Sequence, residues 1–240
     1  MDERAGLTVV TWNAQGSHGL DIDAAASSLR EFDAQLIMIQ EIQRRQVGAL
    51  RVALRMADAR WRFKHWPVKV PAEGLGILST QPLAEVRTAV LAHRWSLWNW
   101  RRRVAVECSV ELGPRRVRFV DVHLGAGVPV AERVRQAHLL ITRANGAVVI
   151  AGDLNAGPGS EELRAFAARG WTDAERGLHP GTPTPATNWP PGPRVSPPTQ
   201  RLDYVLARDT VEVVEAFVPT DWEPWAALSD HLPVVTHLRV

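Results

Sequence analysis

The stretch Ala147–Ser160, AVVIAGDLNAGPGS, decides the fold of this chain. Its first five residues form an unbroken apolar run rich in β-branched side chains, which is typical of a strand buried on both faces. Residues two apart on a strand point the same way, so we expect Asp153 and Asn155 to project together from a strand end, with Leu154 facing the other side. Gly152 lacks a side chain and leaves room for another group to approach the backbone.

A carboxylate and an amide at a strand end have two interpretations. They suit phosphate chemistry, in which one binds a metal or an attacking water and the other donates to a phosphoryl oxygen. Alternatively, Asp153 and Asn155 shape a turn through local hydrogen bonds to the backbone. This stretch alone favours neither interpretation, so the rest of the chain must decide between them.

Size and composition are those of an ordinary globular protein. The 240 residues are 45% hydrophobic and 22% charged, and we expect residues 1–240 to form a single domain. The formal net charge is only +2, so attraction to an anionic partner must come from local patches. Lys64 and Lys69 are the only lysines, and arginine supplies the remaining positive charge. Arginine grips phosphate through a fork of donors, although a GC-rich genome gives the same bias.

The chain shows no sign of a secreted or membrane protein. Cys108 is the only cysteine, so an internal disulfide is excluded. The charged N-terminus lacks the apolar core of a secretory signal, and no apolar run approaches the length of a membrane span. We therefore expect a cytoplasmic protein, with export by a route that needs no leader as the alternative.

Hydrophobic periodicity predicts a chain dominated by strands, with about four helices between them. The expected strands cover 7–11, 36–39, 74–79, 83–91, 104–112, 117–122, 147–151, 202–206, 211–218 and 233–240, and the expected helices cover 21–32, 44–57, 130–144 and 161–169. The segment 177–200 is dense in proline, glycine and threonine and has no periodic element, so it is either functional or mobile. This pattern fits a four-layer α/β/β/α sandwich of two mostly antiparallel sheets.

Six polar clusters stand at the ends of these expected strands. They are Asn13, Glu41, His123, Asp153 with Asn155, Asp203, and Asp230 with His231. Taken singly, each is more often a solvated loop residue, but six in one chain are hard to reconcile with chance. Their carboxylate and amide oxygens are ligands of the kind that Mg²⁺ prefers.

With these residues in view, the chain resembles the endonuclease/exonuclease/phosphatase superfamily, which includes DNase I, exonuclease III and the apurinic endonucleases. The matching motifs, in the family's order, are TWNAQGS at 11–17, IQE at 39–41, GLGILS at 74–79, DVHLG at 121–125, AGDLNAGP at 151–158, RLDYVL at 201–206 and SDHLPV at 229–234. TWNAQGS is also similar to the nuclease subunit of cytolethal distending toxin. The resemblance implies a metal-dependent phosphodiesterase, and first a DNase I-like endonuclease.

The resemblance assigns the metal to oxygen ligands. Glu41, supported by Asn13 and Asp230, would bind a divalent cation, with Mg²⁺ expected and Mn²⁺ as the alternative. The cation would polarise a phosphoryl oxygen and stabilise the leaving oxyanion.

The resemblance also assigns the proton transfers. His231, held in its tautomer and orientation by Asp203, would handle the proton of the attacking water. Asp153 would position that water or bind a metal, and Asn155 would hold the phosphate.

His123 bears on the subclass. DNase I-like nucleases and the sphingomyelinase-like branch resemble this chain in having histidine here, whereas the apurinic branch has a Tyr-containing pattern. His123 would serve as general acid or phosphate ligand, oriented by Glu73. Without the motif, a histidine satisfied inside a β-sandwich is the alternative.

The substrate class is less defined by the sequence. Segment 93–103, HRWSLWNWRRR, combines Trp95, Trp98 and Trp100 with Arg101, Arg102 and Arg103. Such a segment can stack bases and neutralise phosphates, or it can enter a membrane interface. A buried packing role for the tryptophans is the third interpretation.

We expect nucleic acid to be the substrate of a monomeric protein, with Glu73, Arg103, Asn188 and Trp189 as substrate-binding residues. The alternatives are a phospholipid or sphingomyelin-type phosphodiesterase, a small-molecule phosphatase on the same scaffold, and a catalytically inactive binding protein.

Overall fold

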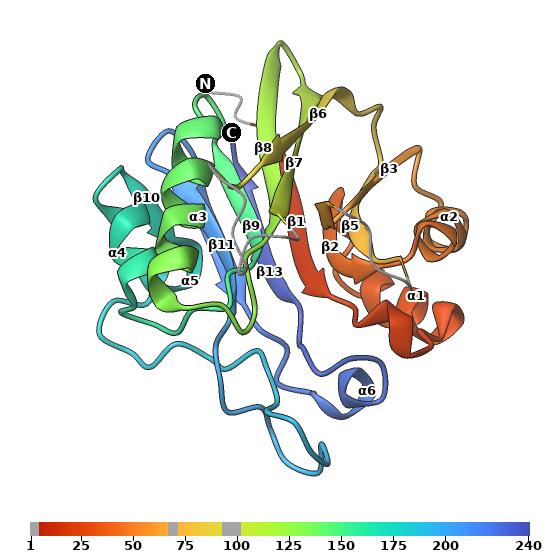
Figure 1. The fold of residues 1–240 in the computed structure, drawn as a ribbon. Helices are drawn as coiled ribbons and strands as arrows, with labels where there is room; N and C mark the ends of the chain where they lie inside the picture. Colours follow the sequence, from red (N-terminus) through yellow and green to blue (C-terminus); the bar gives the residue numbers. More distant parts are fainter. Residues whose placement is uncertain (1–4, 67–71, 93–101) are drawn as a thin grey trace.

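The structure is a computed structural model that describes residues 5–66, 72–92 and 102–240 (Figure 1). Most of the tryptophan- and arginine-rich segment, residues 93–101, lies outside the described residues. Its predicted contact with bases or membrane therefore stays a prediction.

The first sheet has six strands, and it carries both ends of the described chain. Its order is β12 (Glu212–Phe217), β13 (Val234–Arg239), β1 (Gly6–Asn13), β2 (Leu36–Ile42), β5 (Gly74–Ser79) and β3 (Asp58–Phe63). Only β1 and β2 run parallel among these described pairs. Because parallel neighbours end at the same edge, the polar residues that close β1 and β2 are brought side by side.

The second sheet pairs the strand of the AGDLNAGP motif with its neighbours. Its order is β10 (Trp171–Asp173), β11 (Asp203–Arg208), β9 (Val149–Asp153), β8 (Arg115–His123), β7 (Arg102–Leu112) and β4 (His65–Trp66), with β6 (Ala84–Val90) also paired to β7. Strands β8 and β9 are parallel, and the other described pairs are antiparallel.

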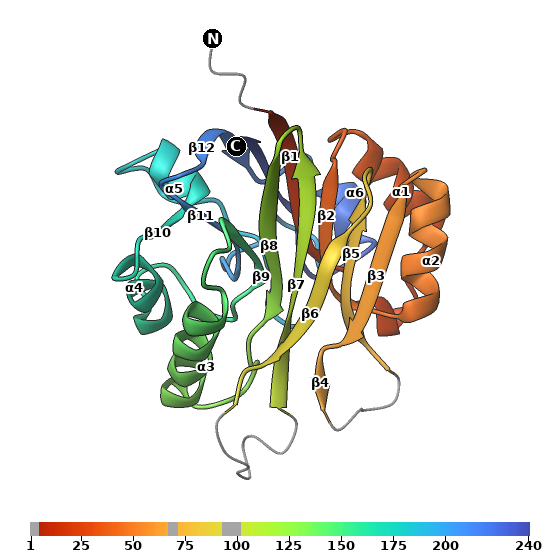
Figure 2. The ribbon, with the colours of Figure 1, turned by 90° about the horizontal axis from the view of Figure 1, so that it is seen from above.

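The two sheets stack face to face, with helices on their outer sides (Figures 1 and 2). The helices are α1 (Ile22–Arg30), α2 (Arg44–Ala53), α3 (Val130–Arg143), α4 (Glu161–Ala167), α5 (Ala174–Leu178) and α6 (Glu223–Ala226), with a short 3-10 turn η1 (Gly16–His18). None of these helices, over the part of the chain that the structure describes, has the length and apolar character needed to cross a bilayer. The predicted four-layer α/β/β/α sandwich is confirmed.

Two hydrophobic cores follow from the alternation of side chains along the strands. In β7 the expected inward row, Val104 to Val110, packs into the core shared by both sheets, α1 and α2. On β8 the opposite face, with Val120 and Val122, packs under α3 and α4 in the second core. Since Asp121 and His123 alternate with these residues, their side chains face the space between the sheets.

Several elements escaped the sequence analysis. Strand β3 was missed because DARWRF is an arginine-rich edge strand that is nowhere fully buried, so it lacks an apolar alternation. Strands β4 and β10 and helices α5 and α6 have five residues or fewer, too few to show a period. Helix α2 ends at Ala53 rather than near Ala57, because Arg55 takes a left-handed φ of 56°.

Gly152 is the one position of the central strand where only glycine fits. Its φ is +145°, and a Cβ built on it would stand 1.9 Å from the carbonyl oxygen of Val122 on the neighbouring strand. The group that approaches its backbone is thus β8 itself. This close packing sets the spacing between His123 and Asp153, which are paired one residue further along.

Gly152→Ala is therefore expected to destabilise the protein by more than about 2 kcal/mol, because the strand pair must separate or strain. Chemical denaturation monitored by circular dichroism measures the change. Gly157→Ala is the matched control, since a Cβ there meets nothing within 4 Å. Equal unfolding free energies for the two variants would contradict the proposed role of Gly152.

Candidate active site

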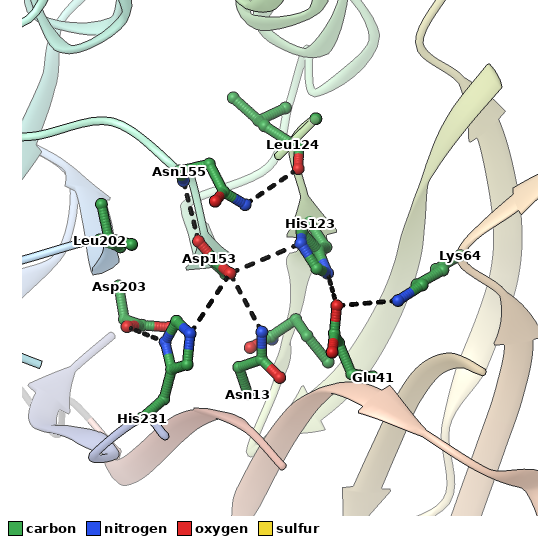
Figure 3. A network of polar contacts seen from close by, with 12 residues as sticks. Asn13, Glu41, Lys64, His123, Leu124, Asp153, Asn155, Leu202, Asp203 and His231 are labelled. Atoms are coloured by element: carbon green, nitrogen blue, oxygen red, sulfur yellow. Dashed lines mark hydrogen bonds and ion pairs between the residues drawn. The ribbon is translucent and has the colours of Figure 1, made fainter. Parts of the chain in front are cut away.

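The polar strand ends converge at one edge of the sandwich, between the two sheets (Figure 3). On the second sheet, Asp153 is the direct neighbour of both His123 and Asp203 in the strand register. On the first sheet, Asn13 stands beside Gln40, the residue before Glu41. The two sets meet where the Asn13 amide donates to Asp153 Oδ2 at 3.0 Å.

Asp203 and His231 form a buried hydrogen-bonded pair. His231 Nδ1 lies 2.7 Å from Asp203 Oδ2, and the other ring nitrogen, Nε2, lies 3.9 Å from Asp153 Oδ2. The Thr187 hydroxyl also donates to Asp203 Oδ2 at 2.7 Å, and the Trp12 indole donates to the His231 carbonyl at 2.9 Å. These contacts hold the ring with Nε2 directed toward Asp153.

Asp153 is the centre of the cluster. Its Oδ1 accepts the backbone N–H of Asn155 at 2.8 Å, while Oδ2 faces His123 Nε2 at 3.5 Å. Asp153 therefore makes the local turn contact to the backbone and also faces the other polar residues of the cluster, so the two interpretations of this motif are compatible. The expected strand alternation beyond Asp153 is wrong, because β9 ends there and Asn155 is left-handed with φ 49°. The Asn155 amide donates to the Leu124 carbonyl at 3.2 Å, which keeps it beside the site.

Glu41 reaches the site through a β-bulge. Its φ is 55°, and the pairing of β2 with β5 shifts register between Ile39 and Ile42. The Gln40 side chain points to the second sheet, where it bonds Asp121. Successive residues of a regular strand face opposite sides, so Glu41 would point away from the second sheet if β2 were regular. With the bulge, Glu41 Oε1 instead lies 3.7 Å from His123 Nδ1.

A polar contact between the sheets supports these strand ends. The Gln40 amide donates to Asp121 Oδ1 at 2.7 Å and to the Thr11 hydroxyl at 3.0 Å. Burial raises the pKa of Asp121 well above its usual range, which favours the neutral form of this carboxyl. Gln40 precedes Glu41 and Asp121 lies two residues before His123, so the contact ties together the strands that carry both groups.

Lys64 is a site residue that the sequence analysis did not identify. Its ammonium donates to Glu41 Oε1 at 2.8 Å and also bonds the Glu73 carboxylate. The lysine is 7% exposed and follows β3 directly. Its rarity was the available signal, since this arginine-rich chain keeps only two lysines.

Arg103 adds a second cation to the same side. Burial lowers the pKa of its guanidinium, while the charges of Glu41, Asp153 and Glu73 oppose that change. Its Nη1 is buried and has no hydrogen-bond partner among the described residues. Such a guanidinium N–H, beside a carboxylate cluster, is able to donate a hydrogen bond to a phosphoryl oxygen.

The segment before β11 forms a wall of the site. The Asn188 amide donates to the Asp230 carbonyl at 3.0 Å, and its backbone pairs with Gln200 and His231. Trp189 is 4% exposed, and its ring packs against Trp222 with centroids 6.0 Å apart, rather than lining an open surface.

Two hydrogen bonds connect the segment before β11 to Gln15 and Asp230 at the edge of the site. Arg194 donates to Gln15 Oε1 at 3.0 Å, and the Gln15 amide donates to Asp230 Oδ2 at 2.9 Å. Gln15 was missed in the sequence although it lies within the TWNAQGS motif.

The ionisation of the centre follows from its burial and charges. Burial lowers the pKa of His231, but the charge of Asp203 and the hydrogen bond to it more than offset this and raise the pKa to about 10. Burial, aided by the charge of Asp203, raises the pKa of Asp153 to about 7. Pairing with Asp203 therefore favours the protonated form of His231, and burial makes Asp153 hold a proton more readily than an exposed aspartate does.

The donor set fits a divalent cation. Asp153, Asp203 and His231 offer ligand atoms that all lie within 4.8 Å of one another, and Asp203 Oδ1 is buried without a hydrogen-bond partner among the described residues. The carboxylate oxygens of this set are hard ligands of the kind that a divalent cation such as Mg²⁺ prefers. The two predicted ligands lie on either side of Asp153, each separated from it by a histidine. His123 lies between Glu41 and Asp153, and His231 lies between Asp230 and Asp153.

Solved structures share this fold at low sequence identity. An endonuclease/exonuclease/phosphatase from Bacteroides vulgatus is 18% identical and matches with a TM-score of 0.80 over 99% of this chain and 100% of its own. The mannosyl-6-phosphatase Bt3783 of Bacteroides thetaiotaomicron is 17% identical, with a TM-score of 0.75 over 98% and 100% of the two chains. D. rerio TDP2, solved with a single-strand DNA product, is 16% identical, with a TM-score of 0.70 over 98% and 99%.

No curated protein matches the sequence. The sequence model described as "Endonuclease/Exonuclease/phosphatase family" matches residues 10–231, from the strand that carries Asn13 to His231 itself. The chain therefore belongs to the endonuclease/exonuclease/phosphatase family, whose members are phosphoric ester hydrolases.

Proposed function

We propose that the protein is a divalent-metal-dependent phosphodiesterase that hydrolyses nucleic acid, in the manner of a DNase I-like nuclease. The observation that carries this proposal is the arrangement around Asp153. The Asp153 Oδ2 atom lies 3.5 Å from His123 Nε2 and 3.9 Å from His231 Nε2, at the junction of both sheets, and burial raises the pKa of this carboxyl. Phosphodiester hydrolysis needs a group to take the proton of water and donors for the phosphoryl oxygens, and the cluster supplies both.

Glu41 and Asn13 would hold the cation, with Asp230 as a further oxygen donor. When bound, Mg²⁺ or Mn²⁺ would neutralise charge on the phosphoryl group and on the leaving oxygen. The carboxylates of this set are hard oxygen ligands, which suit Mg²⁺.

The chain's own residues divide the remaining work. Asp153 in its ionised form orients the attacking water and accepts its proton. His231, protonated through its pairing with Asp203, donates from Nε2 to a phosphoryl oxygen. The family resemblance implies that His231 handles the proton of the water; here Asp153 takes that role, because pairing with Asp203 raises the pKa of the His231 ring.

The remaining donors would bind the phosphate. Arg103 offers Nη1, which has no hydrogen-bond partner among the described residues, and His123 faces Asp153 through Nε2 and Glu41 through Nδ1. The amide of Asn155 stands beside them. A fork of arginine donors with amides and imidazoles matches the oxygens of a phosphodiester.

The family fold does not select the substrate. Structures of this fold include a mannosyl-6-phosphatase and a protein in complex with single-strand DNA product. Nucleic acid is proposed here because of the arginine excess and of His123, the residue that the sequence analysis links to DNase I-like nucleases.

A substrate panel tests the proposal. With Mg²⁺, we expect hydrolysis of bis-p-nitrophenyl phosphate, plasmid DNA and single-stranded oligonucleotides, and loss of all three activities with EDTA. The panel includes sphingomyelin liposomes and mannose 6-phosphate as competing substrates. Hydrolysis of either of these without hydrolysis of nucleic acid would overturn the nuclease assignment, and hydrolysis unaffected by EDTA would overturn the metal dependence.

A further inference from the structure

A second positively charged feature lies outside the catalytic cluster, between helix α2 and the edge strand β3. The segment 43–63 contains six arginines and a single acid, Asp58, so its formal charge is +5 in a chain whose net charge is +2. Helix and strand are neighbours in the fold, as Figure 2 shows from above. This is the kind of local patch that a nearly neutral chain needs if it binds a polyanion.

The two elements enclose a groove of about 490 Å³, which we call the arginine groove. It is lined by Arg44, Arg51, Arg60, Arg62, Phe63 and Gly48, among others. Arg60 is paired with Asp58. Over the described part of the chain, Arg44, Arg51 and Arg62 have no carboxylate within ion-pair distance, and all three are exposed. Their charges are therefore available to a ligand.

Protection of a sheet edge explains only part of this arrangement. Charged residues on an edge strand prevent pairing with another chain, which accounts for Arg60 and Arg62 on β3. It does not account for Arg44 and Arg51, which face the same groove from helix α2. Helix α2 and strand β3 thus both present arginines to one groove, and this concentration of positive charge attracts anions.

Residues at one end of the groove are neighbours in the chain of residues in the catalytic cluster. Lys64, which bonds Glu41, follows the last residue of β3, and the Trp61 indole donates to the carbonyl of Ile42, next to Glu41. Phe63 is 38% exposed at this end, in edge contact with Trp61 at 4.6 Å between ring centroids. An exposed ring flanked by arginines can stack a base while the guanidinium groups bind phosphates.

We propose that the arginine groove binds the phosphate backbone of a nucleic-acid strand that extends from the active site. The inference rests on the proposed nuclease function and adds that the substrate is a polymer held at a distance from the scissile bond. A concave groove suits a chain that lies along it, whereas insertion into a lipid interface requires an apolar face. Vesicles are therefore the competing probe in the test.

The first test is charge neutralisation with a matched control. Arg44, Arg51 and Arg62 are changed together to Gln, and the control changes Arg87, Arg115 and Arg143 to Gln. The control arginines are exposed and lie outside the groove, and both triple variants shift the net charge from +2 to −1. Fluorescence anisotropy in EDTA with a labelled 20-nucleotide oligonucleotide measures binding without cleavage, and thermal melting checks that each variant is folded.

We expect the groove variant to bind the oligonucleotide about tenfold or more weakly and to lower the salt slope of log Kd by roughly two, since each lost phosphate contact removes about 0.7 from the slope for single strands. The control triple variant should match the wild type. Equal binding by the groove variant and the wild type, or equal losses in both triple variants, would overturn the proposal.

A second test adds a charge instead of removing one. Gly48 lines the groove, and a Cβ built on it meets nothing within 4 Å. Gly48→Glu places a carboxylate in the groove, and Gly48→Gln is a neutral variant of the same size; both residues favour a helix over glycine. We expect Glu, but not Gln, to weaken oligonucleotide binding severalfold. Equal affinity of the two variants would contradict the proposal.

Activity separates this inference from the proposed function. Loss of kcat/KM for a 20-nucleotide substrate should exceed the loss for bis-p-nitrophenyl phosphate by about tenfold in the groove variant. A wild type that hydrolyses the small diester but binds phosphatidylserine vesicles and not the oligonucleotide would overturn the groove proposal and leave the phosphodiesterase assignment standing. A wild type that hydrolyses no phosphodiester would contradict the proposed function itself.

Discussion

His231→Ala is expected to lower kcat/KM for a phosphodiester by about 10²–10⁴-fold, the usual contribution of a positioned acid or base. The ring is the proton donor that Asp203 holds 2.7 Å away, with Nε2 directed toward Asp153. Alanine removes that donor while the neighbouring strands keep their pairing. Steady-state kinetics on bis-p-nitrophenyl phosphate at saturating Mg²⁺ measure the effect, and circular dichroism checks the fold. Near-normal activity would refute the role of His231.

Asp203→Asn provides the matched test of the pair. The pKa of His231 in the folded protein is raised from 6.5 to about 10, so the stability that the pair contributes is fully present below pH 6.5 and is lost as the pH rises through 10. The Asn variant removes the charge that raises this pKa. NMR titration should then show His231 titrating at a lower pH, and the variant should lose stability relative to wild type at pH 6 but not near pH 11. An unchanged titration would show that Asp203 does not control the ring.

Glu41→Gln is expected to weaken Mg²⁺ binding by at least about a hundredfold, because loss of groups that only support a metal ligand already costs 10–100-fold. Glutamine keeps the size of the side chain but removes its charge. It also leaves Lys64 without the partner at 2.8 Å, so the local charge becomes more positive and repels a cation. Isothermal titration calorimetry with Mg²⁺ measures the affinity directly and does not depend on turnover.

Glu111→Gln is the control for this prediction. Glu111 is exposed on β7 and pairs with Arg116 at the opposite end of β8 from His123, so its removal changes the net charge equally without touching the cluster. Its Mg²⁺ affinity should equal that of the wild type. If Glu41→Gln also binds Mg²⁺ normally, Glu41 is not a ligand and the carboxylates around Asp153 must hold the cation instead.

Much of this architecture could be predicted from the sequence, because the patterns that indicate its strands and helices lie within short stretches of the chain. The β-branched run before Asp153, the alternation in β7 and the polar residue at each strand end were enough to predict the sandwich. Edge strand β3 was not predictable, since partial burial on one side leaves no apolar period. Short elements such as β10 and α5 form through packing on neighbours that are distant in sequence.

The sequence by itself determined which residues stand at strand ends, because strand length and period are encoded in neighbouring side chains. It placed Asn13, Asp153 and Asp203 at sheet edges without any knowledge of partners. Only the tertiary structure decided what they meet: the bulge that turns Glu41 inward, and Lys64 between two carboxylates. It likewise decided that α2 and β3 share one groove. A bulge and a contact between distant segments depend on how sheets and helices pack against one another, and no local period records that packing.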